Sequence, residues 1–128
     1  MRYCWTTIIV KDLERSLAFY CDIVGLPIVR QLSGAHGNIV FLGDGDTNIE
    51  LIENPHAAVV TGNRISLGFA VDSLDAMLEF VASKKIDVES GPFRPNEHIR
   101  FFYVLDPDGV RVQFSESRRH TDSGGYII

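Results

Sequence analysis

Four histidines and two cysteines are the side chains of this chain best suited to bind a metal ion or attack a substrate. The histidines fall in segments predicted to be loops, and none pairs with another at metal-ligand spacing: His36, His56, His98 and His120. No Ser-His-Asp or Cys-His order stands out. The glycine-containing turn 43–45 precedes a predicted strand rather than a helix, which argues against a phosphate-binding loop. These residues therefore predict no metal site and no cofactor.

Composition excludes several classes of partner. The chain has 128 residues, 45% of them hydrophobic and 23% charged, as in a soluble globular domain. A net charge of -5 without a basic stripe argues against nucleic acid and suits a small-molecule partner. No apolar run could span a bilayer, and the N-terminus lacks a signal-peptide core. Cys4 and Cys21 make no disulfide framework, so we expect packed thiols in the cytoplasm.

Hydrophobic periodicity predicts the order β, α, β, β, β in the first half. Residues 1–10 alternate as a strand, with Thr6, Ile8 and Val10 on the helix-facing side. Asp12 is a good N-cap for a helix over 13–24, which Gly25 ends. Three strands follow, over 28–32, 39–42 and 48–52. The helix is expected to bury four residues at helical spacing: Leu13, Leu17, Tyr20 and Val24.

The second half repeats this order. A strand over 65–71 precedes a helix capped by Asp72 or Ser73, and its buried stripe is Leu74, Met77, Leu78 and Val81. Residues 86–89 are predicted to be a short strand and 91–96, with two prolines, a loop. A hairpin ends the module, with its turn at 106–109 and Leu105 opposite Val110. That register predicts a helix-packed side made of Phe101, Tyr103, Leu105, Val110, Val112 and Phe114.

The two halves form an internal repeat. Four apolar positions of the first half recur in the second at one constant offset, from Val10 and Val71 (71 − 10 = 61) to Phe19 and Phe80 (80 − 19 = 61). We expect one domain over 1–117, with modules at about 1–54 and 64–117, a linker at 55–63 and a C-terminal tail at 118–128. Each module has a half-exposed sheet that could pack against the other sheet or a second chain, which predicts a homodimer.

Two motifs within these modules resemble a known family. Residues 10–20, VKDLERSLAFY, are similar to the first helix of the vicinal oxygen chelate (VOC) superfamily, and Asp106-Pro107-Asp108-Gly109 is similar to its last turn. This superfamily includes glyoxalase I, bleomycin-resistance proteins and extradiol dioxygenases. The resemblance covers about residues 3–117. It implies an α+β fold in which two βαβββ modules form a curved mixed sheet around a cavity.

The resemblance also implies four metal-ligand positions, because catalytic members bind a divalent metal through His, Glu or Gln, His and Glu. These positions match Trp5, Glu50, Ser66 and Gln113. Trp cannot ligate a metal, Ser is a poor neutral ligand, and an amide oxygen binds weakly. One carboxylate does not satisfy an ion that prefers about four strong donors. The resemblance therefore supports the fold, whereas the residues argue against the metal chemistry.

The same strands predict a pocket without a metal. Small side chains at Ser66, Gly68 and Ala70 leave room on one strand, and Trp5 and Phe102 offer flat aromatic surface. The polar groups of this pocket would come from Glu50, Arg111 and Gln113. Trp5 could instead be a core or dimer-interface aromatic, and Glu50 and Arg111 could form an ion pair with each other.

Three functions remain open on sequence grounds. The first is metal-independent binding of a small molecule, such as an antibiotic or another aromatic ligand, similar to the bleomycin-resistance branch. The second is a lyase or isomerase of the lactoylglutathione lyase type, in which Glu50 moves a proton. The third is a glyoxalase-like metalloenzyme with unusual ligands. The ligand-binding set common to the first two is Trp5, Glu50, Ser66, Phe102, Arg111 and Gln113.

Overall fold

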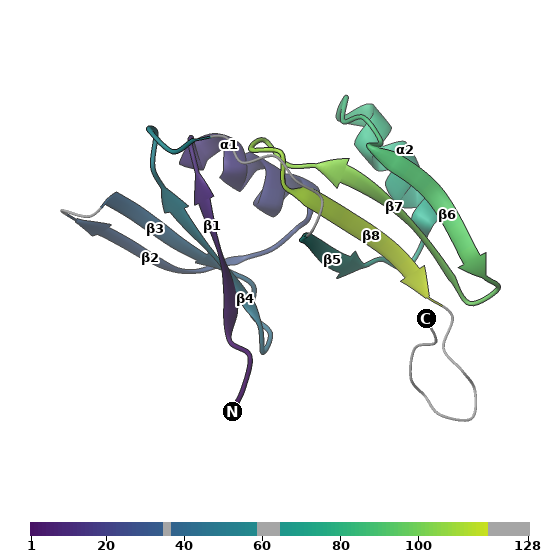
Figure 1. Ribbon diagram of the computed structural model, residues 1–128, viewed down its shortest axis with the longest axis horizontal. Coiled ribbons are helices and arrows are strands. Elements are labelled where there is room, and N and C mark those ends of the chain that lie inside the picture. Colours follow the sequence, from purple (N-terminus) through teal and green to yellow (C-terminus); the bar gives the residue numbers. More distant parts are fainter. Residues whose placement is uncertain (35–36, 59–64, 118–128) are drawn as a thin grey trace. The chain divides into compact units, whose positions relative to one another are not determined.

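The computed structural model describes residues 1–34, 37–58 and 65–117, and the chain divides into two compact units at residues 60 and 61. Each unit is a βαβββ module with its own four-stranded sheet (Figure 1). The predicted fold class is therefore confirmed. The predicted domain limits, 1–117 with a tail at 118–128, stay a prediction. No helix among the described residues has the length and apolar character needed to cross a membrane.

The first module builds a mixed sheet in the strand order β1-β4-β3-β2. β1 runs parallel to β4, and the other neighbours are antiparallel. Its elements are β1 (Trp5–Val10), α1 (Leu13–Leu17), the π-helix η1 (Ala18–Ile23), β2 (Ile28–Gly34), β3 (Gly37–Leu42) and β4 (Asn48–Glu53).

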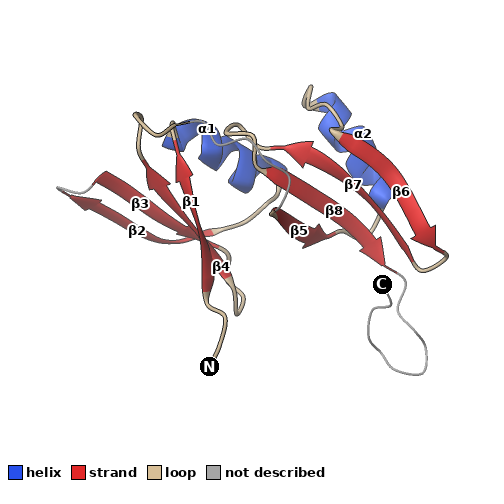
Figure 2. Ribbon diagram, viewed as in Figure 1, coloured by secondary structure: helices blue, strands red, loops and turns tan. Residues whose placement is uncertain are grey.

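The second module has the equivalent strand order β5-β8-β7-β6, again with a parallel outer pair, β5 and β8. Figure 2 shows its single helix beside the sheet. Its elements are β5 (Ser66–Ala70), α2 (Leu74–Ser83), β6 (Ser90–Asn96), β7 (Ile99–Leu105) and β8 (Arg111–Ser117).

Both helices begin at the predicted caps. The side chain of Asp12 accepts a hydrogen bond from the Arg15 N–H, and that of Ser73 accepts one from Ala76. A second acceptor comes from the last strand of each module: Glu53 accepts from Leu13 N–H at 2.9 Å, and Glu116 accepts from Leu74 N–H at 2.7 Å. Each helix N-terminus is thereby tied to its own sheet.

The first helix buries a different stripe from the predicted one. It widens into a π-helix at Ala18, where the Val24 N–H bonds to the Phe19 carbonyl five residues earlier. A wider turn rotates each later side chain less than the 3.6-residue period assumes. Of the predicted stripe, Tyr20 is buried, whereas Leu13, Leu17 and Val24 are only half-buried; Ser16 and Phe19 are buried instead. The widening accounts only for residues after Ala18, because Leu13, Ser16 and Leu17 precede it. Of the stripe predicted for α2, Leu74 and Val81 are buried, whereas Met77 and Leu78 are half-buried.

The register of the last hairpin is one residue away from the predicted one. Asp106, not Leu105, pairs with Val110: the Asp106 N–H donates to the Val110 carbonyl, and the Asp106 carboxylate accepts from the Asp108 and Val110 N–H groups. This places Leu105 opposite Arg111 and Phe102 opposite Phe114. A shift of one residue in a strand's pairing exchanges its two faces.

The prediction that Phe101, Tyr103 and Leu105 pack under the helix is therefore wrong. The buried side of the hairpin consists of Phe102, Val104, Val112 and Phe114, all at most 1% exposed. Val112 and Phe114 remain on the packed side, as predicted.

The prediction for 86–96 is also wrong, because the strand and the loop exchange places. Residues 86–89 form no strand, whereas Ser90–Asn96 form β6 despite Pro92 and Pro95. β6 is an edge strand with an irregular register against β7. An edge strand tolerates proline because the backbone N–H groups on its outer side have no neighbouring strand to bond to, so the N–H that proline lacks is not needed there.

Candidate functional site

In each module, one face of the sheet packs on the helix, and we call the opposite face the open face. In the first sheet, alternation buries Ile8 and Val10 and leaves Trp5, Thr7 and Ile9 of β1 exposed. In the second sheet, Ser66, Gly68 and Ala70 of β5 are exposed, as predicted, while Leu67 and Phe69 turn inward. The candidate site residues lie on these open faces, with one exception.

Trp5 lies on the open face of the first sheet with 51% of its surface exposed. Its ring meets that of Phe41 edge to face, with centroids 5.8 Å apart, and Arg30 stacks on the same Phe41 ring at 5.7 Å. The side chain is thus neither a core residue nor fully solvated. It offers a flat aromatic surface that is held from one side only.

Glu50 lies on the neighbouring strand β4, and its carboxylate accepts a hydrogen bond of 2.6 Å from the hydroxyl of Thr7. The register explains this contact, because Thr7 and Glu50 are direct partners in the parallel pair β1–β4. The structure therefore brings Trp5, Thr7 and Glu50 together on one face. The contact between Thr7 and Glu50 could have been predicted from the sequence only if the register of the β1–β4 pair had been known.

Arg111 and Gln113 lie on the open face of the second sheet, beside Ser66 and Gly68. Both contact Tyr103: the guanidinium of Arg111 lies 3.8 Å from the centroid of its ring, and the Gln113 amide donates to its hydroxyl at 3.2 Å. The amide oxygen of Gln113 lies 3.3 Å from where a Cβ would stand at Gly68, so a larger residue there would press on it.

The ion pair of Arg111 is with Glu89, not with Glu50. Its Nε donates to Glu89 Oε2 at 3.2 Å, and its Nη2 donates to the Ser90 hydroxyl, which in turn donates to Glu89. The Ser90 hydrogen bond is the main cause that lowers the pKa of Glu89; desolvation opposes it, and the hydrogen bond and charge of Arg111 add smaller lowering effects. Sequence reasoning missed Tyr103, because the predicted register put it under the helix. It also missed Glu89 and Ser90.

Phe102 is the exception among the candidate residues. It is fully buried on the α2 side, with its ring centroid 5.5 Å from that of Phe114. The prediction that it lines a pocket with Trp5 is wrong for the same reason as the hairpin register. Phe101 and Tyr103 take its place on the open face, where their rings meet edge to face at 5.8 Å.

The four positions at which the family resemblance predicts metal ligands occupy equivalent places in the two modules. Trp5 pairs with Asn48 and Ser66 with Arg111, and Glu50 and Gln113 each follow two residues later. The two offsets differ by two residues (66 − 5 = 61, 113 − 50 = 63), although the strand pairing is equivalent. The internal symmetry thus agrees with the alignment of these positions.

The donors at these positions do not fit a divalent metal. Indole has no lone pair for a metal, the Glu50 carboxylate is bonded to Thr7, and the Gln113 amide is bonded to Tyr103. Within the described residues, no group of three or more His, Cys, Asp and Glu side chains could hold an ion. His56 and His98 lie in turns, as predicted, while His36 and His120 lie outside the described residues.

Neither cysteine is placed as a nucleophile. Cys4 and Cys21 are half-buried free thiols. Burial, with a smaller contribution from the Asp22 carboxylate, raises the pKa of the Cys21 thiol, which disfavours the reactive thiolate.

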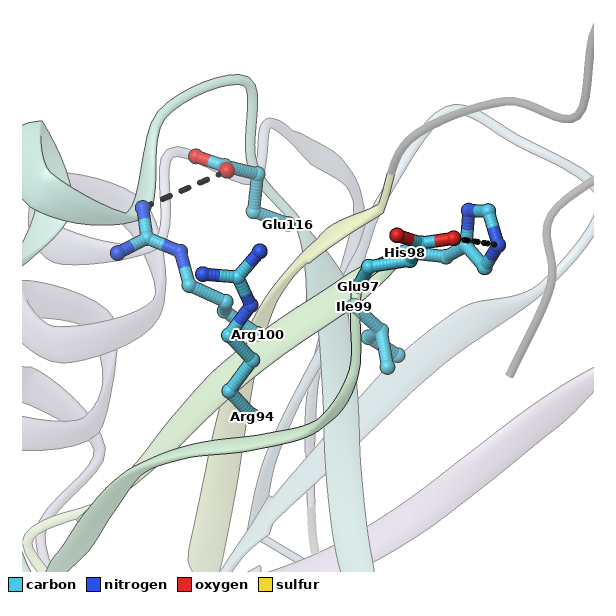
Figure 3. Close-up of a pocket in the computed structure, with 6 residues that line it drawn as sticks. All are labelled: Arg94, Glu97, His98, Ile99, Arg100 and Glu116. Atoms are coloured by element: carbon cyan, nitrogen blue, oxygen red, sulfur yellow. Dashed lines mark hydrogen bonds and ion pairs between the residues drawn. The ribbon is translucent and has the colours of Figure 1, made fainter.

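The structure also contains a pocket of about 230 Å³ in the second module. Figure 3 shows its lining at the turn between β6 and β7 and at the neighbouring end of β8. The lining is mostly charged: Arg94, Glu97, His98, Ile99, Arg100 and Glu116. None of these residues belongs to the predicted site.

Comparison with known protein families gives a match over most of the chain. The family model of the Glyoxalase/Bleomycin resistance protein/Dioxygenase superfamily matches residues 2–114. A lactoylglutathione lyase of Haemophilus influenzae is 32% identical, with 97% of this chain and 98% of that protein covered. The lactoylglutathione lyase of Neisseria meningitidis serogroup A is 30% identical, with 98% of each chain covered.

Solved structures share the fold. TnmS3, an antibiotic binding protein from Streptomyces sp. CB03234, superposes with a TM-score of 0.74 over 92% of this chain and 97% of its own, at 21% identity. A lactoylglutathione lyase from Agrobacterium tumefaciens gives a TM-score of 0.67 at 27% identity, over 88% of this chain and 91% of its own. At so low a sequence identity, the likeness to TnmS3 is one of fold alone.

Proposed function

We propose, since this chain belongs to the Glyoxalase/Bleomycin resistance protein/Dioxygenase superfamily, that it binds a small organic molecule on the open faces of its sheets without a metal ion. The observation that carries the proposal is the set of side chains at the four metal-ligand positions. They offer an aromatic face, one carboxylate, one hydroxyl and one amide, which is a set for packing and hydrogen bonding rather than for coordination.

The surroundings of these positions support a ligand with an aromatic or cationic part. Trp5 and Phe41 present aromatic surface in the first module, and Phe101 and Tyr103 do so in the second. Rings of this kind attract flat apolar groups and cations through their faces. The net charge of -5 would also favour a cation over an anion at long range.

The experiment is a metal analysis combined with a thermal-shift screen. We expect the purified protein to carry no stoichiometric transition metal, and a chelator to leave its melting temperature unchanged, because no metal binding is coupled to folding. A compound library rich in planar and cationic molecules should contain ligands that raise the melting temperature. About one tightly held metal ion per chain, lost when Glu50 is replaced, would contradict the proposal.

A second candidate function is proton transfer by Glu50 in a lyase or isomerase. Two observations favour it: the Glu50 carboxylate is oriented by the Thr7 hydroxyl on an open face, and relatives about 30% identical carry the name lactoylglutathione lyase. Turnover separates this function from binding. If a ligand found by thermal shift is converted to product, and Glu50→Gln abolishes conversion but not binding, the chain is an enzyme.

We further propose that the protein is a cytoplasmic homodimer. The open face of the first sheet carries exposed apolar side chains, among them Trp5, Ile9 and Leu32. Such a surface favours association with another apolar surface. The free thiols of Cys4 and Cys21 suit a reducing compartment.

A further inference from the structure

The lining of the charged pocket of the second module includes none of the candidate site residues. Arg100 and Glu116 lie on the α2 side, as their contacts with Asp75 and Leu74 of that helix show. Phe101 and Ser115, their immediate neighbours along β7 and β8, point to the open face. A molecule in this pocket would therefore not touch Arg111, Gln113 or Tyr103.

The Glu116 carboxylate of the pocket is already engaged. Arg100 donates to Asp75 at 3.3 Å and to Glu116 at 3.4 Å, and the second oxygen of Glu116 accepts the Leu74 N–H. These contacts, that with Asp75 foremost, raise the pKa of Arg100 above its ordinary value. Glu97 lies 3.6 Å from the imidazole of His98, with 81% of its side chain exposed.

Arg94 is the cation of the pocket for which the described residues provide no ion pair. Arg94 and Arg100 both line the pocket, and Figure 3 shows the ring of His98 extending away from both. Because both guanidinium groups line one pocket, an anion bound there would be attracted by both charges. Arg100 uses one N–H of each terminal nitrogen for Asp75 and Glu116, so further donors remain among the five that the group carries.

We propose that Arg94 and Arg100 bind a small oxyanion, such as a phosphate group or a carboxylate, in this pocket. The planar fork of a guanidinium matches two oxygens of either group, and the two forks together provide a site for two or more oxygens. Arg100 is held in place by its two carboxylate contacts, while Arg94 brings the charge that the described residues leave unpaired. This site is independent of the ligand proposed for the open faces.

The test is an NMR titration of the ¹⁵N-labelled full chain with inorganic phosphate and, separately, with acetate, at an ionic strength held constant with sodium chloride. We expect saturable shifts of the Arg94 Nε–H signal and of the backbone amides of 97–100. Saturation with phosphate alone identifies a phosphate site, saturation with acetate alone a carboxylate site, and saturation with both a general oxyanion site.

The matched variants are Arg94→Gln, Arg94→Lys and Arg15→Gln. Arg94→Gln should weaken binding about tenfold or more, the scale of a lost charge-assisted hydrogen bond pair, and Arg94→Lys should restore only part of it because it lacks the fork. Arg15→Gln changes the net charge equally at an exposed position of α1 and should leave the affinity within about twofold. Shifts that do not saturate with either anion, or that weaken equally in both glutamine variants, would overturn the proposal.

Discussion

Trp5 shows how the exposure of one side chain decides between two roles. A core tryptophan would be fully buried, but half of this one is exposed, and the packed side of its strand consists of Ile8 and Val10. The structure therefore rejects the core alternative. A contact surface for a ligand or for a partner chain remains.

Replacing Trp5 with Ala tests the ligand alternative. We expect stability to fall much less than the roughly 3–5 kcal/mol that a buried tryptophan costs, because the site is already open to water. Affinity for a ligand found by thermal shift should fall by about 1–3 kcal/mol through loss of the aromatic surface. Calorimetry measures both quantities.

Phe80→Ala is the control for the Trp5 variant, because Phe80 is an exposed aromatic on α2 and does not lie on the open face of its own sheet. It should leave the affinity unchanged. An unchanged affinity in the Trp5 variant would remove this residue from the proposed site.

Glu89 predicts a pH dependence of stability. Its pKa is lower in the folded chain than in the unfolded one, chiefly through the Ser90 hydrogen bond and also through Arg111, so these contacts stabilise the fold fully above the unfolded value of about 4.3. That stabilisation is lost as the pH falls through the lower, folded value. Glu89→Gln should therefore lower the melting temperature near pH 7 and have progressively less effect below about pH 4.

Melting curves of the wild type and Glu89→Gln between neutral and acidic pH measure this difference. Glu79→Gln removes a charge from an exposed position of α2 and should show no such convergence. A constant difference between wild type and Glu89→Gln at every pH would mean that the carboxylate charge is not what stabilises this contact.

At the scale of elements, the sequence predicts local features well and pairing less well. The caps at Asp12 and Ser73 depend on contacts within three residues, and both are confirmed. The hairpin register depends on how many residues the turn takes up. The Asp106 carboxylate bonds to two backbone N–H groups and closes the turn at Asp106 and Val110, so that the turn is one residue shorter than expected.

That single step also explains the errors in the site. Because of it, the sequence pattern places Phe102 on the open face, although it is buried, and places Tyr103 under the helix, although it lies on the open face. The pattern assigns the other candidate residues to the faces that the structure shows: Trp5, Glu50, Ser66, Arg111 and Gln113. The strand β6 was missed because two prolines in seven residues are more typical of a loop, and only its position at the sheet edge makes it a strand.

The register itself can be tested by two neighbouring substitutions. Phe102→Ala should destabilise the protein by about 3–5 kcal/mol, because it opens a cavity against Phe114. Phe101→Ala removes the same atoms from the half-buried open face, where Phe93 and Tyr103 are its neighbours, and should cost clearly less. Urea denaturation measures both. A larger loss of stability for Phe101→Ala than for Phe102→Ala would support the register expected from the sequence instead.

At the scale of the whole molecule, we predict a homodimer, and the molecular mass in solution tests this prediction. Sedimentation at micromolar concentration should give twice the 14.3 kDa of one chain. Introducing a charge on the exposed apolar face, with Ile9→Lys, should shift the protein towards monomer, whereas Ile65→Lys at an exposed position outside that face should not. A wild-type protein that sediments only with the mass of a single chain would contradict the prediction.

Each sheet takes all four of its strands from its own module. A foreign sequence placed between Ala58 and Ile65 would therefore interrupt no strand pairing among the described residues, and each half would keep the glutamate that caps its helix. We expect the chain to accept a whole reporter domain inserted at this point, with both modules still folded. Such a fusion would carry its reporter between the two modules and would leave both termini of the polypeptide unmodified.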